Sequence, residues 1–182
     1  MRLWSLTGLA EQEGMPGIQE ETLDGQPLAT LEGHAGAVCG ISLNADGRLL
    51  ASGGQDATVR LWKTRTGVLL MTLQGHTGAV WGVSLSADGR LLASGGFDGE
   101  VRLWDANEGR LLARLQGHAG TVWGVSLSAD GRLLVSGGMD GTVRLWSLAD
   151  LRPVKERCSE CRACRVNGRW PRSRGTPVVC GA

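Results

Sequence analysis

Three sets of side chains in this sequence combine a serine, a histidine and an aspartate, the residue types that together activate a nucleophile in hydrolytic enzymes. Each set recurs 42 residues after the previous one, with a tryptophan at a fixed distance. The sets are His34, Ser52, Asp56 and Trp62; His76, Ser94, Asp98 and Trp104; and His118, Ser136, Asp140 and Trp146. An active site needs one solvent-open constellation, whereas these sets occupy equivalent places in a repeat. We therefore predict a structural hydrogen-bond network in each set, no catalytic residue and no enzymatic activity.

A second group that could do chemistry is a run of cysteines near the C-terminus. Cys158, Cys161, Cys164 and Cys180 supply enough thiolates for a tetrahedral zinc site. Zinc knuckles normally take two ligands from each of two separated turns, and here Cys180 stands alone. Arginines of the same stretch could contact nucleic acid, but only Trp170 offers a base a surface for stacking. We expect no metal, no cofactor and no nucleic-acid partner, and keep zinc or nucleic-acid binding through this stretch as an alternative.

The composition indicates a soluble protein of ordinary domain size. The chain has 182 residues, a formal net charge of +1 and 42% hydrophobic residues, so it can build a core but has no strong field toward nucleic acid or membrane. No run of 18 apolar residues suggests a membrane span, and the N-terminus lacks the apolar segment of a secretion signal. Cys39 is the single cysteine before residue 158, which fits a reducing compartment. We expect a cytoplasmic protein without membrane contacts.

A 42-residue repeat must position the three sets. The segment from Gly75 to Trp104 differs from the next, Gly117 to Trp146, at only 5 of 30 positions. Within a unit, four short runs alternate apolar with small or polar residues and are separated by glycine-containing turns, which predicts antiparallel strands. In the second unit these runs are VWGVSL at 80–85, RLLASGG at 90–96, VRLW at 101–104 and RLLARL at 110–115.

The order GH, SADG, LASGG, D and VRLWD resembles the WD-repeat β-propeller family over residues 33 to 148. The resemblance implies an all-β fold: a partial, open propeller with three complete four-stranded blades and a partial N-terminal blade. It also implies that His, Ser, Asp and Trp form a hydrogen-bonded chain in each blade. Only Trp104-Asp105 keeps the literal WD pair. The expected divisions are 1–32, a partial blade with an inserted loop at 7–26; 33–74; 75–116; 117–150, without a regular fourth strand; and 151–182, which is not homologous.

Trp81 and Trp123 begin the first strand of their units, where the first unit has Cys39. The resemblance places this end of the strand near a propeller's top surface, so both indoles are candidate partner-binding residues. Packing between blades is the alternative for both, because tryptophan is highly buried on average. A second row of residues, Arg60, Arg102 and Arg144, is expected to form a solvated face, and Cys39 to be a small buried residue.

Three blades do not close a ring, since propellers have about four to eight. The outermost blades are expected to show apolar faces without a neighbour, and repeat arrays normally cap such faces. Two interpretations remain open: copies assemble to close the propeller, or the chain is a piece of a longer array.

The tail, residues 151–182, matches the repeat only in another reading frame. One choice of codons for PRSRGTPVVCGA at 171–182, with a G placed before it and the frame moved by one nucleotide, encodes ATLQGHAGGVWGV, close to ATLEGHAGAVCGI at 29–41. We interpret the tail as a further repeat translated in a shifted frame and expect it to be disordered.

The leading functional hypothesis is a scaffold of WD repeats that binds protein or peptide partners and is a fragment of a larger propeller protein. The near-identical units resemble those of bacterial WD-repeat arrays. The chain has no GxxxxGK[ST] phosphate loop, so any nucleotide chemistry would lie outside it. The rival hypothesis is a truncated gene product without function.

Overall fold

The structure is a computed structural model, and it describes residues 2–4 and 27–149. These residues form thirteen strands and fall in one unit spanning residues 1–149. The strands are β1 (Arg2–Trp4), β2 (Pro27–Thr30), β3 (Val38–Leu43), β4 (Leu49–Gly54), β5 (Thr58–Lys63), β6 (Val68–Gln74), β7 (Val80–Leu85), β8 (Leu91–Gly96), β9 (Val101–Asp105), β10 (Leu111–Leu115), β11 (Val122–Leu127), β12 (Leu133–Gly138) and β13 (Val143–Ser147). In the described ranges, no helix is long and apolar enough to cross a membrane.

The strands pair in chain order into antiparallel sheets, as the alternating pattern predicts. The first sheet holds β3 to β6 and the second holds β7 to β10. The third sheet holds β11 to β13, and its expected fourth strand would fall beyond residue 149, outside the described residues. A two-stranded pair, β1 with β2, precedes them. The all-β prediction is therefore confirmed, while the prediction of three complete four-stranded blades holds in the described part for two sheets.

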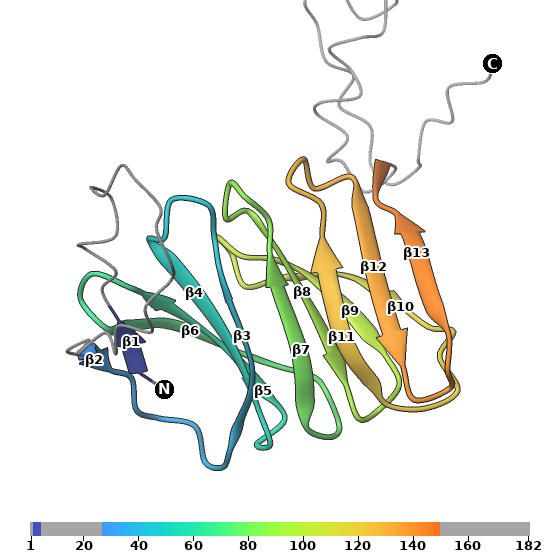
Figure 1. The fold of residues 1–182 in the computed structure, drawn as a ribbon, viewed down its shortest axis with the longest axis horizontal. Helices are drawn as coiled ribbons and strands as arrows, with labels where there is room; N and C mark the ends of the chain where they lie inside the picture. The colour runs from blue at the N-terminus through green and yellow to red at the C-terminus, as the bar shows by residue number, and fades with distance from the viewer. Residues whose placement is uncertain (1, 5–26, 150–182) are drawn as a thin grey trace, which may run out of the picture. The chain divides into compact units, whose positions relative to one another are not determined.

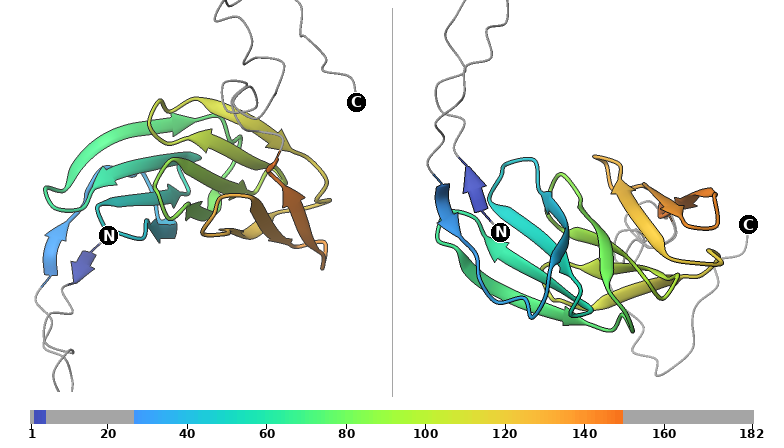
Figure 2. Two further views of the ribbon diagram at one scale, coloured as in Figure 1. Left: turned by 90° about the horizontal axis from the view of Figure 1, so that it is seen from above. Right: turned by 60° about the horizontal axis from the view of Figure 1, so that its bottom comes forward.

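The three sheets follow one another in chain order, with β3, β7 and β11 next to one another (Figures 1 and 2). Glycine lets these inner strands approach closely. A Cβ atom on Gly40 would lie 2.6 Å from the carbonyl oxygen of Trp81, and one on Gly82 would lie 3.0 Å from the Cα atom of Gly124. A larger residue at these positions would push neighbouring sheets apart.

The hydrophobic core lies between successive sheets. Ala51, Val59 and Leu61 of the first sheet belong to one buried cluster with Val80 and Val83 of the second. Equivalent residues of the second sheet, with those of the third, make the next cluster: Ala93, Val101, Leu103, Val122 and Leu134. Leu31, which follows β2, packs with Leu50 and Trp62 of the first sheet. Each sheet is thus stabilised mainly by the sheet beside it.

The array of described sheets is not closed into a ring, as expected. Ile41 and Leu43 of the first sheet are 61% and 52% exposed, although the equivalent residues of the second sheet are buried. At the other end, Val143 and Leu145 of the third sheet are 68% and 71% exposed. Apolar side chains at blade positions therefore face solvent at both ends.

Candidate functional site

Each of the three serine, histidine, aspartate and tryptophan sets forms a continuous chain of hydrogen bonds. In the first sheet the Trp62 indole N–H donates to Ser52 Oγ at 2.8 Å, and Ser52 Oγ lies 2.8 Å from His34 Nε2. His34 Nδ1 is 3.0 Å from both carboxylate oxygens of Asp56. The same bonds, at 2.8 to 3.0 Å, recur in the second and third sheets. These side chains tie the turn before the first strand of a sheet to its second and third strands.

The aspartate also organises its own turn. Asp56 accepts hydrogen bonds from the Thr58 hydroxyl at 2.8 Å and from the Ala35 N–H at 3.0 Å. Asp140 makes the same two contacts with Thr142 and Ala119. The carboxylate therefore supports both the β4–β5 type of turn and the loop that carries the histidine, which is a structural task.

The serine, histidine and aspartate have the distances of a catalytic triad, so burial decides how they act. Ser52, Ser94 and Ser136 are each fully buried, and each already accepts the indole N–H of its tryptophan. A nucleophile must meet its substrate at a solvent-open position. This arrangement leaves the hydroxyl no room for a substrate, and the geometry supports a network within the sheet.

In the second set the surroundings favour a neutral His76 next to a charged Asp98, because the pKa values of both groups are lowered. Burial lowers the pKa of His76, although its hydrogen bond with Asp98 acts in the opposite direction. Burial alone would raise the pKa of Asp56, but hydrogen bonds, led by that from Thr58, outweigh it and hold this pKa at about 2. A neutral histidine with its proton on Nδ1 donates to the aspartate and accepts from the serine hydroxyl, which satisfies every group in the chain.

The arginine row is a correction to the sequence analysis. The solvated face expected for Arg60, Arg102 and Arg144 is wrong for the first two, because the Arg102 side chain is 3% exposed and the Arg60 side chain 16%. Arg102 donates from Nε to Glu100 at 3.0 Å, and its Nη2 lies 3.7 Å from Asp98. The guanidinium groups extend the network at its carboxylate end. Only Arg144, in the third sheet, is 39% exposed.

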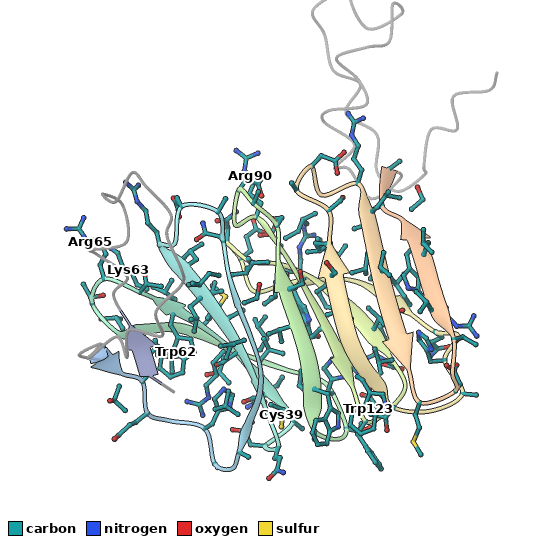
Figure 3. The ribbon with its side chains drawn as sticks, viewed as in Figure 1. Cys39, Trp62, Lys63, Arg65, Arg90 and Trp123 are labelled. Atoms are coloured by element: carbon teal, nitrogen blue, oxygen red, sulfur yellow. The ribbon has the colours of Figure 1, made fainter. Side chains whose placement is uncertain are left out.

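Trp81 and Trp123 lie against each other at the start of β7 and β11. Their ring centroids are 4.9 Å apart at an interplanar angle of 61°, an edge-to-face contact. Trp81 is half-buried, whereas Trp123 remains 50% exposed. Cys39 occupies the equivalent place on β3 and is also half-buried, and Figure 3 shows it at the same end of the sheets as Trp123. The pair therefore serves inter-sheet packing and still offers one indole to solvent.

Two further apolar side chains, which the sequence analysis missed, lie at this end of the sheets. Phe97 and Met139 sit in the turns after β8 and β12 and are 65% and 70% exposed. The N–H of Phe97 donates to the Ala79 carbonyl at 2.8 Å, just before β7, which places it beside the strand start that carries Trp81. The N–H of Met139 makes the equivalent bond to Thr121, before β11. We call Trp81, Phe97, Trp123 and Met139 the apolar rim.

A signal for the rim was present in the repeat itself. The two nearly identical 30-residue segments differ at five pairs of positions: 77 and 119, 79 and 121, 93 and 135, 97 and 139, and 100 and 142. Four of these five pairs fall in the loops at the rim end, before the first strand or between the second and third. The strands are nearly identical while these loops differ, and of the rim residues Phe97 is replaced by Met139 whereas Trp81 and Trp123 are the same.

The comparisons with known proteins agree with this geometry. The family model described as "WD domain, G-beta repeat" matches residues 25–63, 67–105 and 109–147. The chain therefore belongs to the WD40 repeat family, whose members are typically non-enzymatic scaffolds. The tail lies outside both the matched repeats and the described residues, so the interpretation of a shifted reading frame stays a prediction. No group of three metal-ligating side chains occurs in residues 2–4 and 27–149.

Curated relatives match short stretches of the chain. Eukaryotic translation initiation factor 3 subunit I of Phaeosphaeria nodorum is 40% identical over 52 residues, covering 29% of this chain and 16% of the relative. APC/C activator protein CDC20 of Saccharomyces cerevisiae is 39% identical over 62 residues, or 34% and 10%. Periodic tryptophan protein 2 homolog of Schizosaccharomyces pombe is 51% identical over 47 residues, or 25% and 6%. The chain thus spans a small part of these relatives. They are eukaryotic, so they lend no support to the likeness to bacterial arrays.

Proposed function

We propose that this chain is a scaffold without catalytic activity that binds a protein or peptide partner through the apolar rim. The observation that carries the proposal is the exposure of Phe97, Trp123 and Met139 together at one end of the sheets. Large apolar and aromatic side chains at a surface, above all tryptophan, are the residues that dominate binding energy at protein interfaces.

Two features support a rim that is free to evolve its own contacts. The hydrogen-bond network holds the turns that carry Phe97 and Met139 in place, because the aspartate that follows each of these residues is hydrogen-bonded to its histidine. The loops at this end differ between repeats whose strands are nearly identical, and the rim residue of the loop changes from Phe97 to Met139 while both repeats keep the tryptophan. A rigid support with variable tips is suited to recognition.

The relatives fit this proposal, since one is named as a subunit and another as an activator of APC/C, and both names describe action together with other proteins. The single cysteine of the described residues, Cys39, is a free thiol, which fits a reducing compartment, and we propose the cytosol.

The test is to select peptides from a displayed random library on the full chain and to measure their affinity by titration. Trp123→Ala is expected to weaken binding by about 10-fold or more, the effect of losing an interface hot spot. Leu145→Ala is the matched control, because Leu145 is equally apolar and 71% exposed but lies away from the rim. Selected peptides that bind both variants as tightly as the parent chain would contradict the proposal, as would failure to select any.

A further inference from the structure

Contacts between successive sheets repeat with the same partners 42 residues apart. A Cβ atom on Gly53 of the first sheet would lie 2.7 Å from Cγ1 of Val80, and one on Gly95 of the second sheet would lie 2.5 Å from Cγ1 of Val122. The valine that begins the next sheet thus packs directly on each glycine, and we call this packing position the seat of the valine. The following glycine in the series, Gly137 of the third sheet, has nothing within 4 Å of this position.

In a second repeated contact the glycine belongs to the following sheet and the larger side chain to the preceding one. A Cβ atom on Gly89 would lie 2.9 Å from Cδ1 of Leu49, and one on Gly131 would lie 3.3 Å from Cδ1 of Leu91. Each leucine therefore covers the glycine in the first turn of the next sheet. The leucine that ends this series is Leu133, which is 47% exposed.

A hydrogen bond joins the same neighbours. The Leu85 N–H donates to Ser42 Oγ at 3.0 Å, and the Leu127 N–H donates to Ser84 Oγ at 3.0 Å. The equivalent hydroxyl of the third sheet belongs to Ser126, which is exposed. Gly137, Leu133 and Ser126 therefore make up one half of an inter-sheet interface.

The other half of this interface lies on the first sheet. Val38, the equivalent of Val80 and Val122, is 36% exposed, while both of those valines are fully buried. Gly47, the equivalent of Gly89 and Gly131, has nothing within 4 Å of its Cβ position. We call the apolar surface of Val38, Ile41 and Leu43 the leading face, and that of Leu133, Val143 and Leu145 the trailing face.

We propose that the trailing face of one copy of this chain packs on the leading face of a second copy, head to tail. The two faces are the separated halves of a contact that the chain already makes twice within itself. In the complex, Val38 of the second copy occupies the seat at Gly137, and Leu133 covers its Gly47. Ser126 Oγ then accepts the N–H of Leu43 of the second copy. This surface is separate from the apolar rim, so the inference does not depend on the proposed function.

The β1–β2 pair shows where β13 of one copy would lie in the complex with the next copy. The sequence RLWSL occurs at both 2–6 and 144–148, so β13 repeats β1. β1 pairs with β2 through Arg2 opposite Thr30 and Leu3 opposite Ala29, the register of Arg60 with Thr72 and Leu61 with Met71 between β5 and β6. β13 of one copy can therefore replace β1 of the next and pair with its β2, which also covers the outer edge of β13, unpaired in the described residues.

The experiment measures the mass of the full chain, whose single copy weighs 19.2 kDa, by sedimentation velocity over a dilution series. Two variants each damage one face: Ile41→Asp on the leading face and Leu145→Asp on the trailing face. Both side chains are mostly exposed in the single copy, so each variant is expected to keep the parent circular dichroism spectrum. The parent chain is expected to form species of twice this mass or more, and each variant alone to stay at one copy.

Mixing the two variants is the decisive step. A head-to-tail contact has one undamaged pair of faces in the mixture, so a dimer forms and grows no further. Phe97→Asp is the matched control, because this apolar side chain is 65% exposed but lies on neither face, and its assembly is expected to equal that of the parent. A parent chain that stays at one copy at all concentrations, a single variant that still assembles, or a mixture without dimers would each overturn the proposal. Loss of peptide binding in Phe97→Asp would leave it standing.

Discussion

The second and third sheets have nearly the same sequence and the same hydrogen-bond network, but they differ in what covers them. Val101 and Leu103 are fully buried between neighbours, while Val143 and Leu145, 42 residues later, are 68% and 71% exposed. The geometry of the hydrogen-bond network is the same in both sheets, since the serine Oγ lies 2.8 Å from the histidine Nε2 in each. The polar network is therefore formed within one sheet, whereas apolar burial depends on the next sheet.

The largest expected effect comes from truncating the same leucine in both sheets. Leu103→Ala removes a fully buried side chain and leaves a cavity, so it should lower the free energy of unfolding by about 3 kcal/mol. Leu145→Ala removes an exposed one and should change it by less than about 0.5 kcal/mol. Urea denaturation of the two variants, at a dilution at which the chain is a single copy, checks the pair. Equal losses would show that the third sheet is covered in solution.

The next effect is a change of sign between equivalent glycines. Gly95→Ala places a Cβ atom 2.5 Å from Val122 and should destabilise the fold by about 2 kcal/mol through overpacking. Gly137→Ala meets nothing within 4 Å and should stabilise a single copy by about 0.5 kcal/mol, because alanine restricts the unfolded chain. Thermal unfolding at a dilution at which the chain is a single copy distinguishes the two, and a destabilised Gly137→Ala variant would contradict the open space beside Gly137.

Removing the serine hydroxyl should cost the same in both sheets. Ser94→Ala leaves the buried Trp104 indole N–H and an imidazole without their shared partner, and Ser136→Ala does the same to the part-buried Trp146 indole; the expected loss is about 1.5 kcal/mol in either case. Urea midpoints of the two variants test this equality. A much smaller loss for Ser136→Ala would mean that the network needs a neighbouring sheet after all.

A smaller effect is expected where the first sheet departs from the other two. Ala57 has a φ of 61°, in the left-handed region, at the position where the third sheet has Gly141 with a φ of 73°. Ala57→Gly should therefore stabilise the chain by about 1 kcal/mol, since a side chain is strained there. Gly141→Ala is the reverse control and should destabilise by a similar amount. Differential scanning calorimetry gives both values.

The smallest effect is a pH dependence carried by the second sheet. Burial lowers the pKa of His76 from 6.5, while its bond to Asp98 limits the change. The unfolded chain then binds a proton more readily than the folded one, so stability is lost as pH falls below 6.5 toward the lower folded pKa. The lowered pKa of Asp56 acts in a separate window, in which stability is lost as pH falls from 3.8 toward about 2. Urea midpoints between about pH 8 and pH 5, with an NMR titration of His76, follow the first change.

The strands and the network could be predicted because they repeat. Glycine-containing turns set the strand ends, and the serine, histidine, aspartate and tryptophan recur at fixed distances. The strands and network residues assigned in one unit therefore apply to the others. The third sheet shows the limit of this reasoning, since the 42-residue repeat cannot be followed in the sequence beyond residue 148 and no fourth strand can be located from it.

The position of the arginines could not be predicted. Alternation along the third strand predicted that Arg102 points to solvent, but alternation does not show that Gly75 leaves room for a long side chain to turn back toward Asp98. The exposure of Trp123 likewise depends on which neighbour reaches it, and a pattern within one repeat carries no information about that. Contacts between repeats require the structure.

The repeated contacts between sheets have a consequence for how the number of repeats can change in evolution. Every sheet contacts the next one through the same glycine, leucine and serine positions. Gaining or losing one whole 42-residue unit therefore leaves the other contacts between sheets unaltered. Gene duplication can therefore lengthen or shorten the array in complete steps without redesigning its core. Each new unit arrives with its own rim loops, which are then free to diverge.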